Sequence, residues 1–133
     1  MFIKYEDIKE TDITIDARTL TEYDNMKFFK YNIPIINEKQ HKTLKKFPIL
    51  SVPIVLKGLW DKSSEITYEL YDLSDFCEKR IIIGCSQGRL RSPILCLYAK
   101  CLGINAKVLK GGIKPFFSKT KYSIKNLYGF LDI

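Results

Sequence analysis

The sequence predicts a single α/β domain, and three observations support this prediction. Segments typical of strands and of helices alternate along the chain. Residues 80–84 (RIIIG) contain a continuous isoleucine run, which is typical of a central strand in a parallel sheet. The 133 residues amount to one domain, which we place at residues 1–133, and 46% of them are apolar, as in soluble domains. No apolar run approaches the length of a membrane span, so we expect no membrane partner.

The first elements are a strand and a short helix. Residues 13–16 (ITID) are rich in β-branched side chains and predict a strand. Thr19 and Glu22 have the spacing of a capping box, which predicts the start of a short helix. Residues 33–36 are apolar but include Pro34, so this stretch predicts an edge strand or an irregular segment.

The middle of the chain predicts two further helices. Asn37 and Gln40 frame the start of the first, which runs through a lysine-rich piece to residue 46. Residues 47–59 give no assignment, because they are apolar but contain two prolines and a glycine. Ser63 or Ser64 can cap the second helix. Its expected apolar face consists of Ile66, Leu70, Leu73 and Cys77.

The isoleucine-rich strand at 80–84 ends at Cys85, and a polar loop leads from it into another helix. Ser92 is a candidate cap for that helix, and Pro93 suits its first turn. Gly103 can end it in a left-handed conformation. The expected buried face consists of Ile94, Leu95, Leu97, Tyr98, Cys101 and Leu102.

The last elements are a strand at residues 106–109, a turn at Gly111 and Gly112, and a helical segment through Phe116 and Phe117. The strand again follows a helix, as it does in a parallel α/β sheet.

The loop from Cys85 to Ser92 has the pattern C-x-x-G-x-x-R-S, between a strand and a helix. Ligands of open α/β sheets bind at the carboxyl ends of strands, where a tight loop and a helix N-terminus can hold an anion. Arg91 can add a bidentate fork for an oxyanion. Donors arranged in this way favour a thiolate, so Cys85 is the candidate nucleophile and Arg91 its catalytic partner. The expected substrate-binding residues are Ser86, Gln87, Gly88, Arg89, Leu90 and Ser92.

Two alternatives remain open for this loop, and the other reactive side chains have ordinary explanations. Cys85 could be a buried, inert thiol. Arg89 either adds positive charge at the entrance to the anion-binding loop or is a solvated charge without a role in binding. We expect Cys96 and Cys101 in the core, and Cys77 in the core rather than as a resolving thiol. The single histidine, His41, is expected at the surface, and no C-x-x-C pair occurs, so we expect no metal and no cofactor.

The chain has a formal net charge of +7, which favours anionic partners, tRNA among them. The lysines are spread along the chain and not concentrated in one segment, so solubility is the favoured explanation of the charge. The charged start of the chain (MFIKYEDIKE) lacks the apolar region of a signal peptide, which predicts a cytoplasmic protein.

Three segments, in the right order, resemble the rhodanese (sulfurtransferase) superfamily. Residues 15–18 (IDAR) with Thr19-x-x-Glu22-Tyr23 resemble its first motif, the Cys85 loop its active-site loop, and residues 108–114 (VLKGGIK) the strand and turn after it. The resemblance covers roughly residues 10–120. It implies a rhodanese-like fold with a central, mostly parallel sheet flanked by helices on both faces. It also implies structural roles near the site for Asp16 paired with Arg18, and for Gly111 and Gly112.

The loop has seven residues from Cys85 to Arg91, whereas common single-domain rhodaneses have six. Seven is typical of the related cell-cycle phosphatases and arsenate reductases, and of the rhodanese domain of tRNA 2-selenouridine synthase, whose loop reads C-W-R-G-G-M-R-S. Cys85, Gly88, Arg91 and Ser92 match that loop. The nucleotide-binding motif G-x-x-x-x-G-K-[ST] is absent from the sequence, so the expectation is a stand-alone carrier or a split subunit.

The resemblance implies a sulfurtransferase, or a sulfur or selenium carrier, that forms a persulfide on Cys85. Its expected partners are a small anionic sulfur donor or a persulfide-carrying protein, and a tRNA-modifying partner with a nucleotide-binding domain. Two alternatives stay open. One is a phosphatase or arsenate reductase, which needs a general acid such as Asp61 or Glu65. The other is a rhodanese-like module that binds a partner without catalysis.

Overall fold

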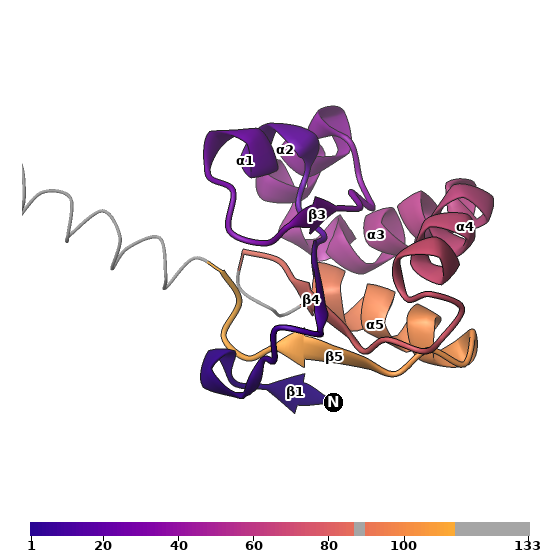
Figure 1. Cartoon of the computed structure of the whole chain (residues 1–133). Helices are drawn as coiled ribbons and strands as arrows, with labels where there is room; N and C mark the ends of the chain where they lie inside the picture. Colours follow the sequence, from indigo (N-terminus) through magenta and orange to yellow (C-terminus); the bar gives the residue numbers. More distant parts are fainter. Residues whose placement is uncertain (87–89, 114–133) are drawn as a thin grey trace, which may run out of the picture.

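Five parallel strands form the central sheet of the computed structural model, which describes residues 1–86 and 90–113 (Figure 1). The strand order is β1-β5-β4-β2-β3, and every neighbouring pair is parallel. The predicted α/β class is therefore confirmed. The strands are β1 (Phe2–Ile3), β2 (Ile13–Asp16), β3 (Tyr31–Asn32), β4 (Ile81–Gly84) and β5 (Ala106–Leu109).

Helices connect the strands. The two expected capping boxes are present, with Thr19 and Glu22 at the start of α1 and Asn37 and Gln40 at the start of α2. Among the described residues, no helix is long and apolar enough to cross a membrane. The helices are η1 (Tyr5–Asp7), α1 (Leu20–Asn25), α2 (Glu38–Lys46), η2 (Pro48–Leu50), α3 (Ser51–Asp61), α4 (Ser63–Leu73) and α5 (Arg91–Cys101).

The isoleucine run of β4 is buried because the strand has core on both faces. Ile81 and Ile83 belong to the larger hydrophobic cluster, which α3, α4 and α5 complete. Ile82 points to the opposite face, where the smaller cluster includes Phe29 and Ile113. Ile8, which follows η1, and Phe28 pack against that smaller cluster. A strand covered in this way needs apolar side chains at every position.

The segment that gave no assignment, 47–59, forms η2 and most of α3. Its prolines are compatible with helix because Pro48 lies at the start of η2 and Pro53 in the first turn of α3, where no intrahelical N–H bond is lost. Gly58 is required by packing, since a Cβ there would lie 2.5 Å from the Ile35 carbonyl oxygen. Helix α3 therefore lies directly against the backbone of residues 35–36.

Two expectations for the α4 region are wrong. Neither Ser63 nor Ser64 caps the helix, because α4 begins at Ser63 itself and its N-cap residue is Lys62. Cys77 is not on the helix face, because α4 ends at Leu73 and the chain then turns through three residues with positive φ, namely Asp75, Phe76 and Cys77. The Cys77 side chain still packs, partly buried, against the larger cluster.

Several features near the end of the described chain are as predicted, but Leu97 and Cys101, which were expected on the buried face of α5, are exposed. Strand β5 has the predicted bounds, and Gly103 follows α5 with φ of +87°, as expected for a left-handed helix end. Residues 33–36 are irregular and follow the edge strand β3, also as expected. The helical segment expected through Phe116 and Phe117 lies outside the described residues.

Replacement of Gly58 by alanine tests the contact between α3 and residues 35–36. Helix propensity alone would favour alanine by about 1 kcal/mol. The clash with the Ile35 carbonyl should instead lower the free energy of unfolding by about 1–3 kcal/mol. Chemical denaturation measures it, with the exposed neighbour Lys57→Ala as the control that should change stability by under about 0.5 kcal/mol. A more stable Gly58→Ala protein would contradict the packing.

Candidate active site

The chain segments that follow three neighbouring strands meet at Cys85. The Ala17 amide, after β2, donates to the Gly84 carbonyl at 2.7 Å, and the Ile113 amide, after β5, donates to the Cys85 carbonyl at 2.8 Å. Gly111 and Gly112 have φ of +79° and +76°, which favours glycine where the chain turns back after β5. Cys85 therefore lies at the carboxyl edge of the sheet, where open α/β folds bind ligands.

The Cys85 side chain lies against the first turn of α5. It is 3% exposed, and its Sγ lies 3.2 Å from Oγ of Ser92, a distance at which either atom can donate. Ser92 was expected to cap α5, and that expectation is wrong, because α5 begins at Arg91 and Leu90 occupies the cap position without a side-chain bond. The Ser92 hydroxyl is thus available to the sulfur, at the end of the helix that carries partial positive charge.

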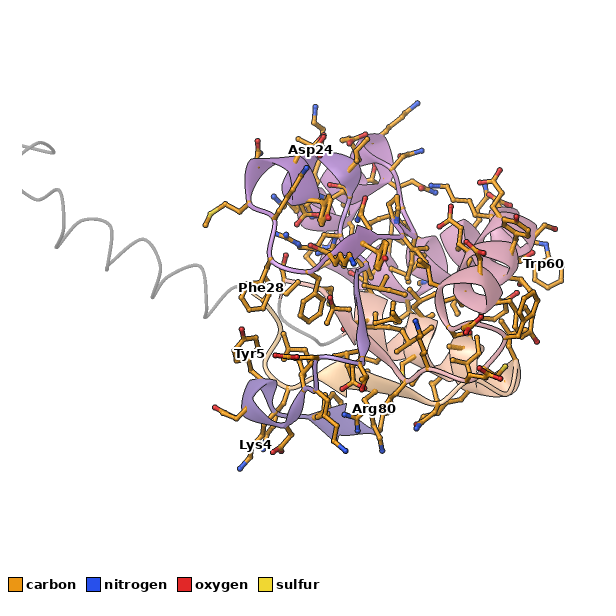
Figure 2. All side chains as sticks on the ribbon, in the orientation of Figure 1. Lys4, Tyr5, Asp24, Phe28, Trp60 and Arg80 are labelled. Carbon is orange, nitrogen blue, oxygen red and sulfur yellow. The ribbon has the colours of Figure 1, made fainter. Side chains whose placement is uncertain are left out.

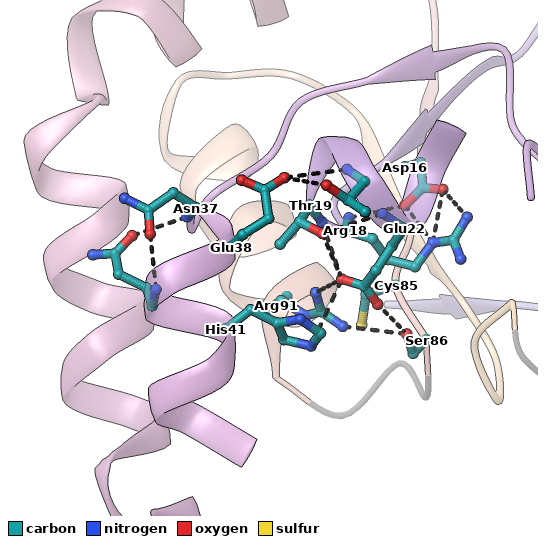
Figure 3. Close-up of polar contacts among 12 residues, drawn as sticks. Asp16, Arg18, Thr19, Glu22, Asn37, Glu38, His41, Cys85, Ser86 and Arg91 are labelled. Atoms are coloured by element: carbon teal, nitrogen blue, oxygen red, sulfur yellow. Dashed lines mark hydrogen bonds and ion pairs between the residues drawn. The ribbon is translucent and has the colours of Figure 1, made fainter. Parts of the chain in front are cut away.

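Arg91 is turned inward beside the loop. Its Nη1 donates to Oε1 of Glu22 at 2.7 Å, and its Nη2 donates to Oγ of Ser86 at 3.2 Å (Figure 3). Ser86 in turn donates to Oε2 of Glu22 at 3.1 Å. Arg91 therefore contacts the residue next to Cys85, and its side chain is only 10% exposed. A guanidinium has five N–H donors, so these two bonds leave others for an anion.

Glu22 has a second role that the sequence did not predict. Its Oε1 accepts from the Thr19 amide at 3.1 Å, and its own amide donates to Oγ1 of Thr19 at 3.3 Å, which together form the expected capping box. The same Oε1 also accepts from the Thr19 hydroxyl and from Arg91. Burial alone would raise the pKa of this carboxyl, but the hydrogen bond and charge of Arg91, with help from His41 and Thr19, lower it to about 2. Glu22 is therefore an anion at neutral pH.

His41 belongs to the edge of the same site, so its expected surface position is wrong. Its side chain is 14% exposed, and its Nε2 lies 3.7 Å from Oε1 of Glu22. Burial lowers the pKa of His41 below 6.5, and the nearby Arg91 charge adds to this, while the Glu22 charge opposes it. Helix α2 therefore places a neutral imidazole beside the loop at neutral pH (Figure 3).

Asp16 and Arg18 form the predicted pair. The Arg18 amide and Nε donate to the Asp16 carboxylate, and Nη2 approaches Oδ2 at 2.6 Å. The same guanidinium donates to the Met26 carbonyl at 2.7 Å. Since Met26 ends α1, the pair fixes the turn that leads from β2 into α1 and so the position of Glu22.

The remaining predicted residues fall into three groups. Gln87, Gly88 and Arg89 lie outside the described residues. The Leu90 side chain packs against the larger core cluster. Among the other cysteines, Cys96 is buried as expected, and burial raises the pKa of its thiol, whereas the expectation for Cys101 is wrong because it is exposed. The described residues contain no group of three or more side chains that could hold a metal ion.

Gly84, the residue before Cys85, has no space for a side chain. A Cβ there would lie 2.8 Å from Cε2 of Phe29 and 3.1 Å from Cδ1 of Ile113. Any larger residue at this position would require the Phe29 and Ile113 side chains of the smaller cluster to shift.

Comparisons with known proteins add a structural neighbour. No family model and no curated protein matches the sequence. The fold is similar to a crystal structure of the N-terminal domain of a protein from Clostridium difficile 630 that is described as ATP/GTP binding. The TM-score is 0.75 at 24% sequence identity, and the match covers 90% of this chain and 98% of that one. A likeness at this identity shows the α/β fold alone.

The ion pair between Glu22 and Arg91 predicts a pH-dependent contribution to stability. Because the folded pKa of Glu22 is about 2, below its usual 4.5, the contribution is present above pH 4.5 and is lost as pH falls toward 2. Glu22→Gln should therefore cost about 2–3 kcal/mol of unfolding free energy at pH 6, and progressively less below pH 4.5. Urea denaturation across this range measures the difference.

The control for this measurement is the same substitution in an Arg91→Gln background. Without the guanidinium, the carboxyl loses its main source of stabilisation, so the pH-dependent difference should shrink strongly. Parallel pH profiles for the wild type and Glu22→Gln would contradict the ion pair.

Proposed function

We propose that this chain is a rhodanese-type sulfurtransferase, or a sulfur or selenium carrier, that acts through a persulfide on Cys85. The observation that carries the proposal is the convergence of Ser92, Ser86 and Arg91 on the loop that Cys85 begins. Cys85 also directly follows the central parallel strand β4, and its sulfur lies 3.2 Å from Oγ of Ser92 in the first turn of α5. Hydrogen-bond donors arranged in this way stabilise an anionic sulfur species.

The proposed first step is attack of the Cys85 thiolate on the outer sulfur of a sulfane donor. With thiosulfate, the new S–S bond forms at Cys85 while the donor S–S bond breaks, and sulfite leaves with the electron pair. The Ser92 hydroxyl stabilises the sulfur anion, and the free N–H groups of Arg91 hold the donor. In the second step an acceptor thiolate or cyanide takes the terminal sulfur and regenerates Cys85.

The proposed role of Glu22 is to hold the Arg91 guanidinium in the orientation that binds an anion. The carboxylate accepts a hydrogen bond from Nη1 of Arg91 at 2.7 Å and another from the Ser86 hydroxyl. The orientation of the guanidinium is therefore fixed before a ligand binds. Fixing the fork in advance removes an entropic cost from anion binding. Glu22 is thus a positioning residue in this proposal.

A phosphatase or arsenate reductase fits the described residues less well. Phosphate ester cleavage requires a general acid near the loop, and the carboxyl nearest Arg91 is Glu22, whose pKa of about 2 keeps it ionised. The two candidate general acids are both exposed, Asp61 at the end of α3 and Glu65 in the first turn of α4. Helix α4 is joined to α5 by a hydrogen bond between the hydroxyls of Thr67 on α4 and Tyr98 on α5. Tyr98 lies two helical turns after Arg91.

The proposed setting is a reducing cytoplasm, where Cys85 does not form a disulfide, and the proposed partner carries a nucleotide-binding domain. Two observations support such a partner. The Cys85 loop resembles that of tRNA 2-selenouridine synthase, and the structural neighbour is the N-terminal domain of a protein described as ATP/GTP binding. The tRNA would be the anionic partner that a net charge of +7 suits.

Sulfur uptake tests the proposed nucleophile. After treatment with thiosulfate, the intact mass of the wild type should increase by one sulfur atom, and cyanide should release it as thiocyanate. Cys85→Ser should abolish both results. Cys96→Ser is the matched control, since it removes another buried thiol, and it should leave uptake unchanged. Release of phosphate from an aryl phosphate by the wild type but not by Cys85→Ser would instead establish the phosphatase alternative.

Arg91→Lys tests the anion fork. Lysine keeps the charge but loses the planar donor pair, so kcat/KM with thiosulfate should fall by about 10²-fold. Arg80→Lys is the control, because Arg80 also pairs with a carboxylate, Asp12 at 2.6 Å, near the opposite end of β4. Its kcat/KM should stay near the wild-type value, and an equal loss in both variants would contradict a specific role for Arg91.

A further inference from the structure

Helix α3 and the turn before it expose an apolar face. Ile49, Val52, Leu56 and Trp60 recur every three or four residues and are 89%, 51%, 49% and 81% exposed. The opposite side of α3, with Val55 and Gly58, is buried against the domain. Trp60 projects away from the ribbon in Figure 2. We call these four residues, with Phe47 and Leu50 beside them, the α3 face.

The α3 face is large enough for a stable interface. From the exposed fractions of its six residues, it presents roughly 600–800 Å² of apolar surface, near the ~800 Å² per partner of standard interfaces. The largest apolar patch on a typical monomer is only about 300–600 Å². We therefore expect another protein surface to cover the α3 face.

The two helices that flank α3 carry opposite charge. Helix α3 contacts both α2 and α4, and it lies between them in Figure 1. Helix α2 has four lysines and one glutamate, a net charge of +3, whereas α4 has three carboxylates and no basic residue, a net charge of −3. The charges form stripes at helical spacing, which are Lys39, Lys42 and Lys46 on α2 and Glu65, Glu69 and Asp72 on α4, all exposed.

We propose that the α3 face is the interface of a homodimer, in which α2 of each copy lies over α4 of the other. A twofold axis along α3 brings the two apolar faces together and also pairs the lysine stripe with the carboxylate stripe twice. The surface is therefore complementary to itself, which an unrelated partner would not require. Within one copy, burial and the charge of Glu65 raise the pKa of Glu69, and none of the ion pairs among the described residues involves this carboxylate stripe.

Sedimentation of the full chain over a range of concentrations is the first test. The wild type should reach twice its 15.5-kDa mass, and the emission of its single tryptophan, Trp60, should shift to shorter wavelength as it does so. Leu56→Glu should weaken dimerisation at least tenfold, because two carboxylates would meet in the apolar interface. Leu20→Glu is the control, since Leu20 is 55% exposed on α1, and it should dimerise normally. A wild type that stays monomeric up to about 100 μM, or a dimer that Leu56→Glu leaves intact, would overturn the proposal.

Charge reversal provides a second test that does not depend on the apolar contacts. One variant carries Lys42→Glu with Lys46→Glu, and the other carries Glu65→Lys with Glu69→Lys. Each should be monomeric alone because like charges then face each other, whereas their mixture should form a heterodimer with near wild-type affinity that weakens in high salt. A mixture that remains monomeric, or variants that dimerise as well alone as together, would contradict the predicted pairing of α2 with α4.

Discussion

The ion pair between Arg91 and Glu22 is the interaction on which the site depends. It joins the first residue of α5 to the first turn of α1, 69 positions apart in the chain, at 2.7 Å. The same carboxylate caps α1 through Thr19 and holds Ser86, and His41 lies beside it. Without this carboxylate the guanidinium would be free to turn toward solvent, and the loop that begins at Cys85 would lose its fixed cation.

The fold creates that junction by bringing strand ends together. Parallel pairing places the residues after β2, β4 and β5 at one edge of the sheet, and backbone hydrogen bonds from Ala17 and Ile113 fix them there. Gly84 allows this close approach because Phe29 and Ile113 occupy the space of its missing side chain. The position of Cys85 thus follows from the packing of the sheet, and its surroundings follow from α1, α2 and α5.

Local patterns in the sequence predicted local structure well. The bounds of β2 and β5 and the capping boxes of α1 and α2 are as expected, because each depends on residues within a few positions. Helix α3 was not predicted, since its prolines and Gly58 are explained only by their positions and by contact with residues 35–36. The placement of His41 beside Glu22 and of Ser92 against Cys85 depends on tertiary contacts, for which a single sequence carries no local signal.

The central claim is that Cys85 is reactive because of the groups around it, and competitive alkylation tests that claim most directly. The four free thiols differ in exposure, from the exposed Cys101 to Cys85 and Cys96, which are 3% and 0% exposed. Peptide mapping after limited treatment with a small alkylating agent at neutral pH should find Cys85 modified first, ahead of Cys101, and protected by thiosulfate. Modification that simply follows exposure, with Cys101 fast and Cys85 as inert as Cys96, would contradict the account.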